Sequence, residues 1–185
     1  MERQDWLRAA RRALVRSGPE AVGVEPLARE LKVTKGSFYW HFKNREELLE
    51  CLLQEWEEET RALFRQAEAC ASPQEALQFL GEYLKKSVAS PLGEYPPDVG
   101  IFNWAAMCPR IAPRVNRIER MRIDALTRIT GRADRAELAY LVWLGFLLRR
   151  HRSPGTAADF PLFFEMMLEL LSPAKKRKKA RRKHV

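Results

Sequence analysis

A group of hydrogen-bond donors surrounds one glycine in the stretch LARELKVTKGSFYWHF, residues 27–42. Lys35, Ser37 and Tyr39 carry an ammonium and two hydroxyl groups that can donate to base edges or to phosphates. Gly36 has no side chain and would let the backbone come close to a nucleic acid. Such residues could make polar contacts with DNA if they lie on one exposed surface.

A very short helix would position these donors. Thr34 is a suitable N-cap, because its hydroxyl can accept a hydrogen bond from a backbone N–H of the first turn. Residues i and i+4 share a helix face, so Phe38 and Phe42 would lie together against a core. The residues left on the outer face and its flanks are Gly36, Tyr39, Trp40, His41 and Lys43. An aromatic-rich helix end is also typical of a protein core, so the spacing alone leaves both interpretations open.

A second short helix is expected just before this one. The sequence PLARELK places Leu27, Ala28 and Leu31 on one apolar stripe, and Pro26 would stand in the first turn, where a missing N–H costs little. Residues 32–34 would link the two helices. Two short helices joined by a tight turn form a helix-turn-helix, whose second helix enters the major groove of DNA.

The sequence VTKGSFYWHFKNREELL, residues 33–49, resembles the signature of the TetR family of bacterial transcription regulators. The resemblance extends over residues 3 to about 56, through RAARRALVRSG and GPEAVGVEPLARELK. It implies that Lys35, Gly36 and Ser37 face bases, whereas other residues of the motif bind phosphate or flank the groove. The full set of expected DNA-binding residues is Thr34, Lys35, Gly36, Ser37, Tyr39, Trp40, His41, Lys43 and Arg45.

Two positions depart from the family pattern. Arg45 stands where relatives usually have a lysine, so the expected phosphate contact keeps its charge but changes its donor geometry. Glu25 and Pro26 open the first helix of the motif, where relatives often have hydrogen-bond donors. Base contacts from that helix are therefore in doubt.

The net charge of +9 is unevenly distributed. Residues 1–43 carry 9 Lys or Arg against 5 Asp or Glu, whereas residues 44–173 carry 16 against 19. The final stretch AKKRKKARRKHV has 8 basic residues and no acidic one. This separates a basic head, a mildly acidic body and a cationic tail, and only the head and tail suit contact with a polyanion.

Periodicity and helix-capping signals predict an all-α fold. Gly18-Pro19 would end a first helix that begins near Arg3, and Asn44 with Glu47 has the spacing of a capping box that starts a long helix reaching about Cys70. Later helices are expected to open at Ser72-Pro73, to span about 99–107, 135–150 and 160–171, and to end at Gly131. The expected domains are a helix-turn-helix domain at 1–46, a helical effector-binding and dimerisation domain at 47–172, and a basic, disordered tail at 173–185.

The last two expected helices are apolar on almost every side, which is typical of buried helices. In proteins of the TetR family, these helices pair with their copies in a second subunit as a four-helix bundle. Gly145 fits this arrangement, because a glycine inside a helix is often present for close packing. Burial within one chain is the alternative. The expected interface residues are Leu141, Leu144, Gly145, Leu148, Phe163, Phe164, Met167 and Leu170.

The body resembles the family more loosely, because IFNWAAMCPRIAPRVNRIERMRIDALTRITG is similar to a segment of the family's sensor domain. In the family this domain encloses an effector pocket, so the resemblance implies such a pocket here. Each candidate for its lining could equally be plain core. No histidine lies between His41 and His151, so the metal-dependent drug binding of the tetracycline repressor does not transfer. We expect a largely apolar effector and no cofactor. The candidate lining residues are Phe64, Tyr83, Phe102, Trp104, Met107, Met121 and Trp143.

Other function classes find little support in the sequence. The three histidines and three cysteines have no partners at metal-ligand spacing, and there is no glycine-rich phosphate loop. No signal peptide is visible, and the longest uncharged apolar run, 138–148, is too short to span a membrane. We therefore predict a cytoplasmic, homodimeric repressor that a small molecule releases from a palindromic operator, rather than an enzyme. A regulator that acts only through protein partners is the alternative.

Overall fold

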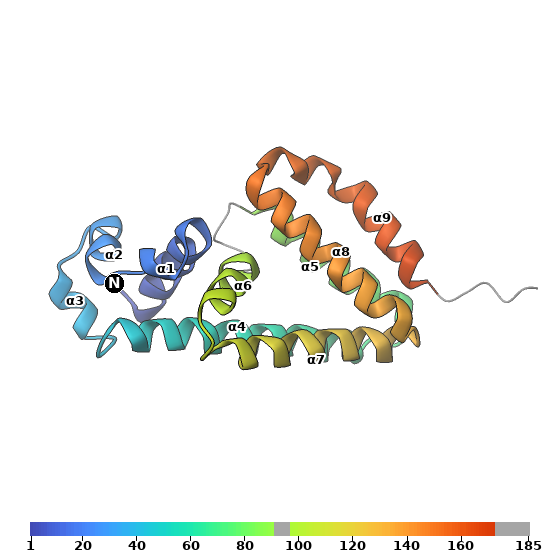
Figure 1. Cartoon of the computed structure of the whole chain (residues 1–185), viewed down its shortest axis with the longest axis horizontal. Coiled ribbons are helices and arrows are strands. Elements are labelled where there is room, and N and C mark those ends of the chain that lie inside the picture. The colour runs from blue at the N-terminus through green and yellow to red at the C-terminus, as the bar shows by residue number, and fades with distance from the viewer. Residues whose placement is uncertain (91–96, 173–185) are drawn as a thin grey trace, which may run out of the picture.

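The computed structural model describes residues 1–90 and 97–172, and within these ranges all regular secondary structure is helical (Figure 1). This confirms the all-α class. The expected disordered tail lies outside the described residues. The elements are α1 (Arg3–Ser17), η1 (Pro19–Ala21), α2 (Val24–Glu30), α3 (Lys35–Tyr39), α4 (Arg45–Glu68), α5 (Pro73–Ala89), α6 (Asp98–Met107), α7 (Ala112–Thr130), α8 (Ala133–Arg152), η2 (Pro154–Asp159) and α9 (Phe160–Leu171).

The head consists of α1, α2 and α3 packed around fully buried aromatic rings. Trp6 of α1 meets Phe38 of α3 edge to face, with ring centroids 5.2 Å apart, and Phe42 stacks on Phe38 at 5.3 Å. Gly18 ends α1 with a φ of 79°, which a glycine adopts without strain, and its N–H donates to the carbonyl of Leu14. The three helices therefore present α3 from a rigid base.

The long helix α4 leaves the head and runs beneath the body beside α7 (Figure 1). Asn44 caps it as predicted, since its side chain accepts from the N–H of Glu47 at 2.8 Å. The Glu47 carboxylate accepts from the N–H of Lys43 at 2.6 Å instead of completing the box on Asn44. From α1, Arg11 donates to Glu55 at 2.7 Å and to a second α4 carboxylate, so α4 is also fixed laterally to the head.

The body is a bundle in which α5, α8 and α9 lie across one end of the α4–α7 pair (Figure 1). Gly131 ends α7 in the left-handed conformation at φ 67°, and Ser72 caps α5 by accepting from the N–H of Glu75. The helix α8 begins at Ala133 and ends at Arg152, so it extends two residues beyond each end of the expected span of 135–150. The buried apolar residues of the body form a second hydrophobic cluster, which is distinct from the cluster in the head.

The helix α6 joins the two regions, because it packs on α1 as well as on α7 and α8. Ile101 is fully buried in the head cluster, and a Cβ built on Gly100 would approach the Leu14 side chain and carbonyl to 3.0 Å. The absence of a side chain at Gly100 thus favours this close approach of the two helices, since a Cβ there would crowd Leu14. The head core thus continues past residue 46 into α6 and the first half of α7.

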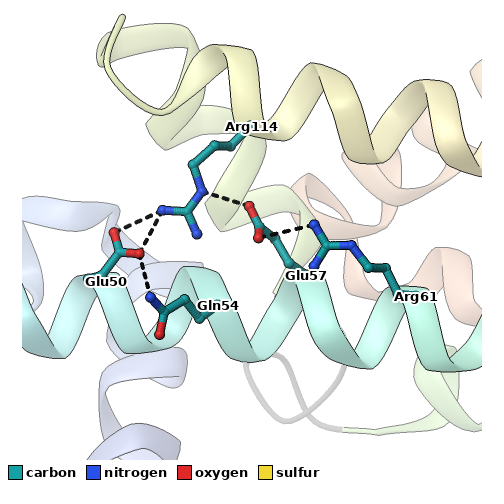
Figure 2. A network of polar contacts seen from close by, with 5 residues as sticks. All are labelled: Glu50, Gln54, Glu57, Arg61 and Arg114. Carbon is teal, nitrogen blue, oxygen red and sulfur yellow. Dashed lines mark hydrogen bonds and ion pairs between the residues drawn. The ribbon is translucent and has the colours of Figure 1, made fainter.

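A polar network holds the start of α7 against α4 (Figure 2). The Arg114 guanidinium donates through Nε to Glu57 at 2.7 Å and through Nη1 to Glu50 at 2.7 and 2.9 Å. Gln54 and Arg61 donate in turn to these two carboxylates. One arginine therefore spans two turns of α4 and sets its register against α7.

Candidate functional site

The helix α3 has the two faces that its sequence predicts. Phe38 and Phe42 are 0% and 2% exposed, whereas Trp40 is 87% and Tyr39 61% exposed. Backbone and side chains that could meet DNA therefore lie on the solvent side of α3. Of the remaining expected contact residues, Lys35, Gly36 and Lys43 are exposed, while Ser37 and His41 are half-buried.

Thr34 occupies the N-cap position of α3, but its hydroxyl makes no capping bond, which corrects the expected role. The N–H of Ser37 bonds to the Thr34 carbonyl at 3.1 Å, and the Ser37 hydroxyl donates to the same carbonyl at 3.0 Å. The tight first turn thus uses the Thr34 backbone, and the exposed Thr34 side chain stays at the surface. The Ser37 hydroxyl would have to leave this bond to donate to a base.

Lys35 forms an ion pair with Glu25, which opens α2. Both side chains are more than half exposed, and the hydrogen bond from Lys35 lowers the pKa of the Glu25 carboxyl below its ordinary value. The sequence identified Glu25 as a departure from the family but gave no sign of this partner. The pair places a carboxylate beside a residue that is predicted to contact bases, so Lys35 would have to exchange Glu25 for DNA to make that contact.

Arg45 is half-buried and braces the turn between α1 and α2. Its guanidinium donates to the carbonyls of Val22 at 2.7 Å and Pro19 at 2.6 Å, and it lies 3.7 Å from Glu20. This bracing role was not predicted. The expected phosphate contact stays a prediction, and it would have to use the N–H groups of Arg45 that these carbonyls leave available.

A cavity of about 80 Å³ lies in the body among α4, α5, α7, α8 and α9. Phe64, Tyr83 and Trp143 line it, as expected. The other four candidates, three on α6 and one on α7, do not line it. Phe102 meets Trp56 edge to face and borders a separate open hollow, Trp104 and Met121 pack against the head cluster, and Met107 is 75% exposed.

The cavity wall also holds a buried ion pair that the sequence did not reveal. Arg122 on α7 and Asp98 at the start of α6 are 6% and 3% exposed, and their nearest N and O atoms are 2.7 Å apart. Burial alone would lower the pKa of Arg122, but the charge and hydrogen bond of Asp98, together with smaller contributions from Tyr140 and Tyr83, raise this pKa above its ordinary value. A signal was present, since Arg122 interrupts an apolar stripe that contains Ile118 and Ala125.

The helix α8 presents an exposed apolar stripe, which includes the expected interface residues Leu141, at 55% exposed, and Leu148, at 49%. Gly145 lies on the same side, and a Cβ built on it would have nothing within 4 Å. Leu144 is half-buried beside this stripe. The other exposed apolar residues of α8 are Leu138 and Val142.

The expected face of α9 needs correction. Phe163 stacks on Phe146 inside the chain at 4.3 Å, and Phe164 and Met167 line the cavity. The large apolar residues that α9 does expose are Leu162 and Met166, at 65% and 62%. Since α9 is apolar nearly all round, its periodicity could not show which side faces the chain's own core. Leu170 is half-buried and packs at the edge of that core.

A metal centre or a membrane span would need features that residues 1–90 and 97–172 do not contain. In these ranges, no three His, Cys, Asp or Glu side chains are grouped so that they could hold a metal ion. No helix in this part of the chain is both long and apolar enough to cross a membrane.

Residues 7–52 match the family model of bacterial regulatory proteins of the tetR family. A TetR-family transcriptional regulator from Streptomyces coelicolor has a similar structure, with a TM-score of 0.62 at 19% identity over 91% of this chain and 85% of that one. GusR of Salmonella enterica gives 0.62 at 18% identity, over 91% and 94% of the two chains. A TetR/AcrR-family regulator from Thermobifida fusca gives 0.55 at 17%, over 94% and 98%. No curated protein matches the sequence significantly.

Proposed function

We infer that this chain, a DNA-binding transcriptional regulator of the TetR family, works in the cytoplasm as a homodimeric repressor. In this proposal two copies bind a palindromic operator, and a small molecule in the body releases them. The DNA-binding role comes from the family of the head, residues 7–52. The cytoplasmic location, the repressor role, the dimer with its palindromic operator, and the effector are the parts that we add.

The exposed outer face of α3 is the observation that carries the proposal. A tryptophan that is 87% exposed next to two buried phenylalanines has no role in the core of this chain. Lys35 and Lys43 flank it with positive charge, and the glycine between them leaves room for a close approach of DNA. The second helix of a helix-turn-helix meets the major groove with this kind of surface.

The apolar stripe on α8 supports the homodimer. Leu138, Leu141 and Leu148 are all about half exposed and follow helical spacing, and a contiguous apolar surface on a soluble protein usually marks an interface. Gly145 would let the partner's helix come close. Because Phe163, Phe164 and Met167 pack inside the chain, the α9 part of the proposed interface shifts to Leu162 and Met166. A two-fold dimer carries two copies of α3, so its operator should be a palindrome with half-sites about one helical turn, or a multiple, apart.

The route from the cavity to the head supports release by an effector. Phe64 of α4 lines the cavity, and α4 leads directly to α3 through Asn44. A ligand that moves α4 would change the separation of the two heads in a dimer. Binding linkage is reciprocal, so operator DNA would then weaken effector binding by the same factor.

The proposal is tested by selecting binding sites from random duplex DNA with the purified protein. We expect a palindromic consensus and a protected footprint that covers both half-sites. In parallel, Leu141→Glu should give a monomer in analytical ultracentrifugation and lose the footprint, while Lys85→Glu, a change on α5 away from the stripe, should do neither. A consensus with no two-fold symmetry, or full binding by the Leu141→Glu monomer, would overturn the dimeric mechanism.

The small size of the cavity favours one alternative, a regulator that does not respond to a small molecule and acts through protein partners. Ligand pockets usually have volumes of about 300–1,000 Å³, and this one has about 80 Å³. A thermal-shift screen followed by operator-binding assays separates the two. The alternative requires that no compound that stabilises the protein changes its affinity for the operator.

A further inference from the structure

Arg122 is, with its partner Asp98, one of two charged groups in a mostly apolar cavity wall. Most of the residues around it are aliphatic or aromatic, such as Leu80, Leu126 and Trp143. Burying a guanidinium is costly unless its charge is paired and its N–H groups find acceptors. The arrangement of those acceptors therefore indicates what the cavity can bind.

The partners of Arg122 satisfy its charge but not all of its donors. Nη2 donates to Asp98 at 2.7 Å and to the Thr60 hydroxyl at 3.0 Å, and the guanidinium lies 5.4 Å from the centre of the Trp56 ring. Trp56 also donates to the same Asp98 oxygen at 2.7 Å. The Nε–H of Arg122 is buried and has no acceptor. An unpaired buried donor is destabilising, so this N–H is the group that a ligand oxygen would satisfy.

The hydroxyl of Tyr140, another residue of the cavity wall, already has a hydrogen-bond acceptor. Tyr140 lines the same cavity, and its hydroxyl donates to Glu119 at 3.1 Å. That bond leaves the Tyr140 oxygen as a poor partner for a ligand acceptor, since its only proton is committed. Of these two lining residues, Arg122 is therefore the one with a buried donor that still lacks an acceptor.

Charge balance distinguishes between the possible acceptors. Arg122 and Asp98 already neutralise each other, so a carboxylate ligand would add an uncompensated negative charge to a buried site. A protonated amine would bring further N–H donors and a positive charge, whereas the Nε–H of Arg122 needs an acceptor. An uncharged carbonyl oxygen accepts a hydrogen bond and leaves the charge balance unchanged.

The volume limits the size of the ligand. An apolar cavity of about 150 Å³ holds a benzene molecule, and this cavity measures about 80 Å³. Only a molecule somewhat smaller than benzene would fit without displacing the walls.

We propose that this cavity binds a short, uncharged, mostly apolar carbonyl compound, such as a small ketone or aldehyde, whose oxygen accepts a hydrogen bond from Arg122. This rests on the proposed function, because it names the chemical class of the effector. The ion pair connects α4, α6 and α7 through Trp56, Asp98 and Arg122. The ligand oxygen therefore binds where the body meets the helix that leads to the head.

The test compares 2-butanone, propionate and 2-aminobutane, which have the same number of non-hydrogen atoms but carry no charge, a negative charge and a positive charge. Each is titrated against the full-length protein in a thermal-shift assay. We expect saturable stabilisation by 2-butanone alone, on the order of 3–5 °C at ten times its Kd. Equal shifts with all three probes, a preference for propionate or 2-aminobutane, or no shift with any of them would overturn the proposal.

Variants then locate the binding site. Arg122→Met alone would leave Asp98 buried without its partner. The variant to use is therefore the double change Asp98→Asn with Arg122→Met, in which the amide oxygen introduced at position 98 can still accept from Trp56. We expect this variant to fold and to lose the response to 2-butanone. Arg128→Met is the matched control, because it removes an exposed arginine from the same helix, and it should keep the full response. A response that persists in the double variant would overturn the assignment to Arg122.

An operator-binding assay separates failure of this inference from failure of the proposed function. Intact operator binding with no response to 2-butanone in the thermal-shift assay overturns the ligand class and leaves the regulator standing. A response to 2-butanone that depends on Arg122, together with an unchanged operator affinity, supports the site and overturns its role in release.

Discussion

Two ion pairs of this protein, one at the proposed DNA-binding surface and one in the cavity wall, lie in opposite environments. In the head, Lys35 and Glu25 are 57% and 62% exposed on the surface proposed to meet DNA. In the body, the side chains of Arg122 and Asp98 are 7% and 4% exposed in the wall of the cavity. Exposed pairs contribute little to stability and exchange partners readily, whereas a buried charge left alone is strongly destabilising. The head pair therefore suits an exchange with DNA, and the body pair suits a fixed frame for a ligand.

The largest expected effect comes from breaking the buried pair. Asp98→Ala leaves the Arg122 guanidinium buried without a counter-charge and removes the acceptor of Trp56, so the free energy of unfolding should fall by about 3–5 kcal/mol. Urea unfolding at a fixed protein concentration measures it. Glu68→Ala breaks the more exposed Arg128–Glu68 pair and should cost at most about 1 kcal/mol. Similar losses in both variants would remove the contrast between buried and exposed pairs.

A smaller loss is expected where α5 meets α9. A Cβ on Gly81 would lie 1.9 Å from the Phe164 ring, so Gly81→Ala must displace that ring and should destabilise the protein by about 1–3 kcal/mol. Gly145→Ala is the matched control, since a Cβ there meets nothing within a single chain. It should leave the folded monomer intact and weaken only dimerisation. Chemical unfolding and sedimentation measure the two effects, and a neutral Gly81→Ala would contradict the packing described for Phe164.

The exposed pair is expected to affect DNA selectivity more than folding. Lys35→Ala should cost about 1–3 kcal/mol of discrimination at one base pair in each half-site, with little change in thermal stability. Glu25→Gln should tighten binding to DNA, because it frees Lys35 and removes a negative charge from the surface. Site selection and fluorescence anisotropy with the selected operator measure both changes. An unchanged consensus for Lys35→Ala would show that Lys35 does not contact bases.

The smallest expected effect concerns the basic stretch at 173–185, which lies outside the described residues. Truncation after Pro173 removes its 8 Lys and Arg residues and should leave the footprint and the dimer unchanged. It should reduce the steepness of log K against log salt by up to about 0.9 for each phosphate that these residues neutralise in the full-length protein. Equal salt slopes for the full-length and truncated proteins would mean that these residues only aid solubility.

Local signals explain why much of the fold was predictable from the sequence. Helix boundaries at Gly18, Asn44, Ser72 and Gly131 depend on a few neighbouring residues, and all four are borne out. The two faces of α3 follow from helical periodicity in the same way.

Contacts between distant segments account for what the sequence did not reveal. Asp98 and Arg122 are far apart along the chain, and only the packing of α6 on α7 brings them together. The side of α9 that faces the interior depends on Gly81, which receives the Phe164 ring. The Glu25–Lys35 pair depends on the angle between α2 and α3. Arg122 does interrupt an apolar stripe, but no pattern along the chain identifies Asp98 as its partner, and the other two features leave no pattern at all.

The hydrogen bonds from Arg114 to Glu50 and Glu57 have a mechanical consequence for α4. At 1.5 Å per residue, the 24-residue helix α4 is about 36 Å long. The midpoint between Glu50 and Glu57 lies about 16 Å along the helix from Phe64 at the cavity and about 13 Å from Arg45 at the head. In the proposed release by an effector, we expect this point to act as the pivot of a lever with two arms of similar length. A ligand that pushes the Phe64 end outward should swing the head end the opposite way, by nearly the same distance.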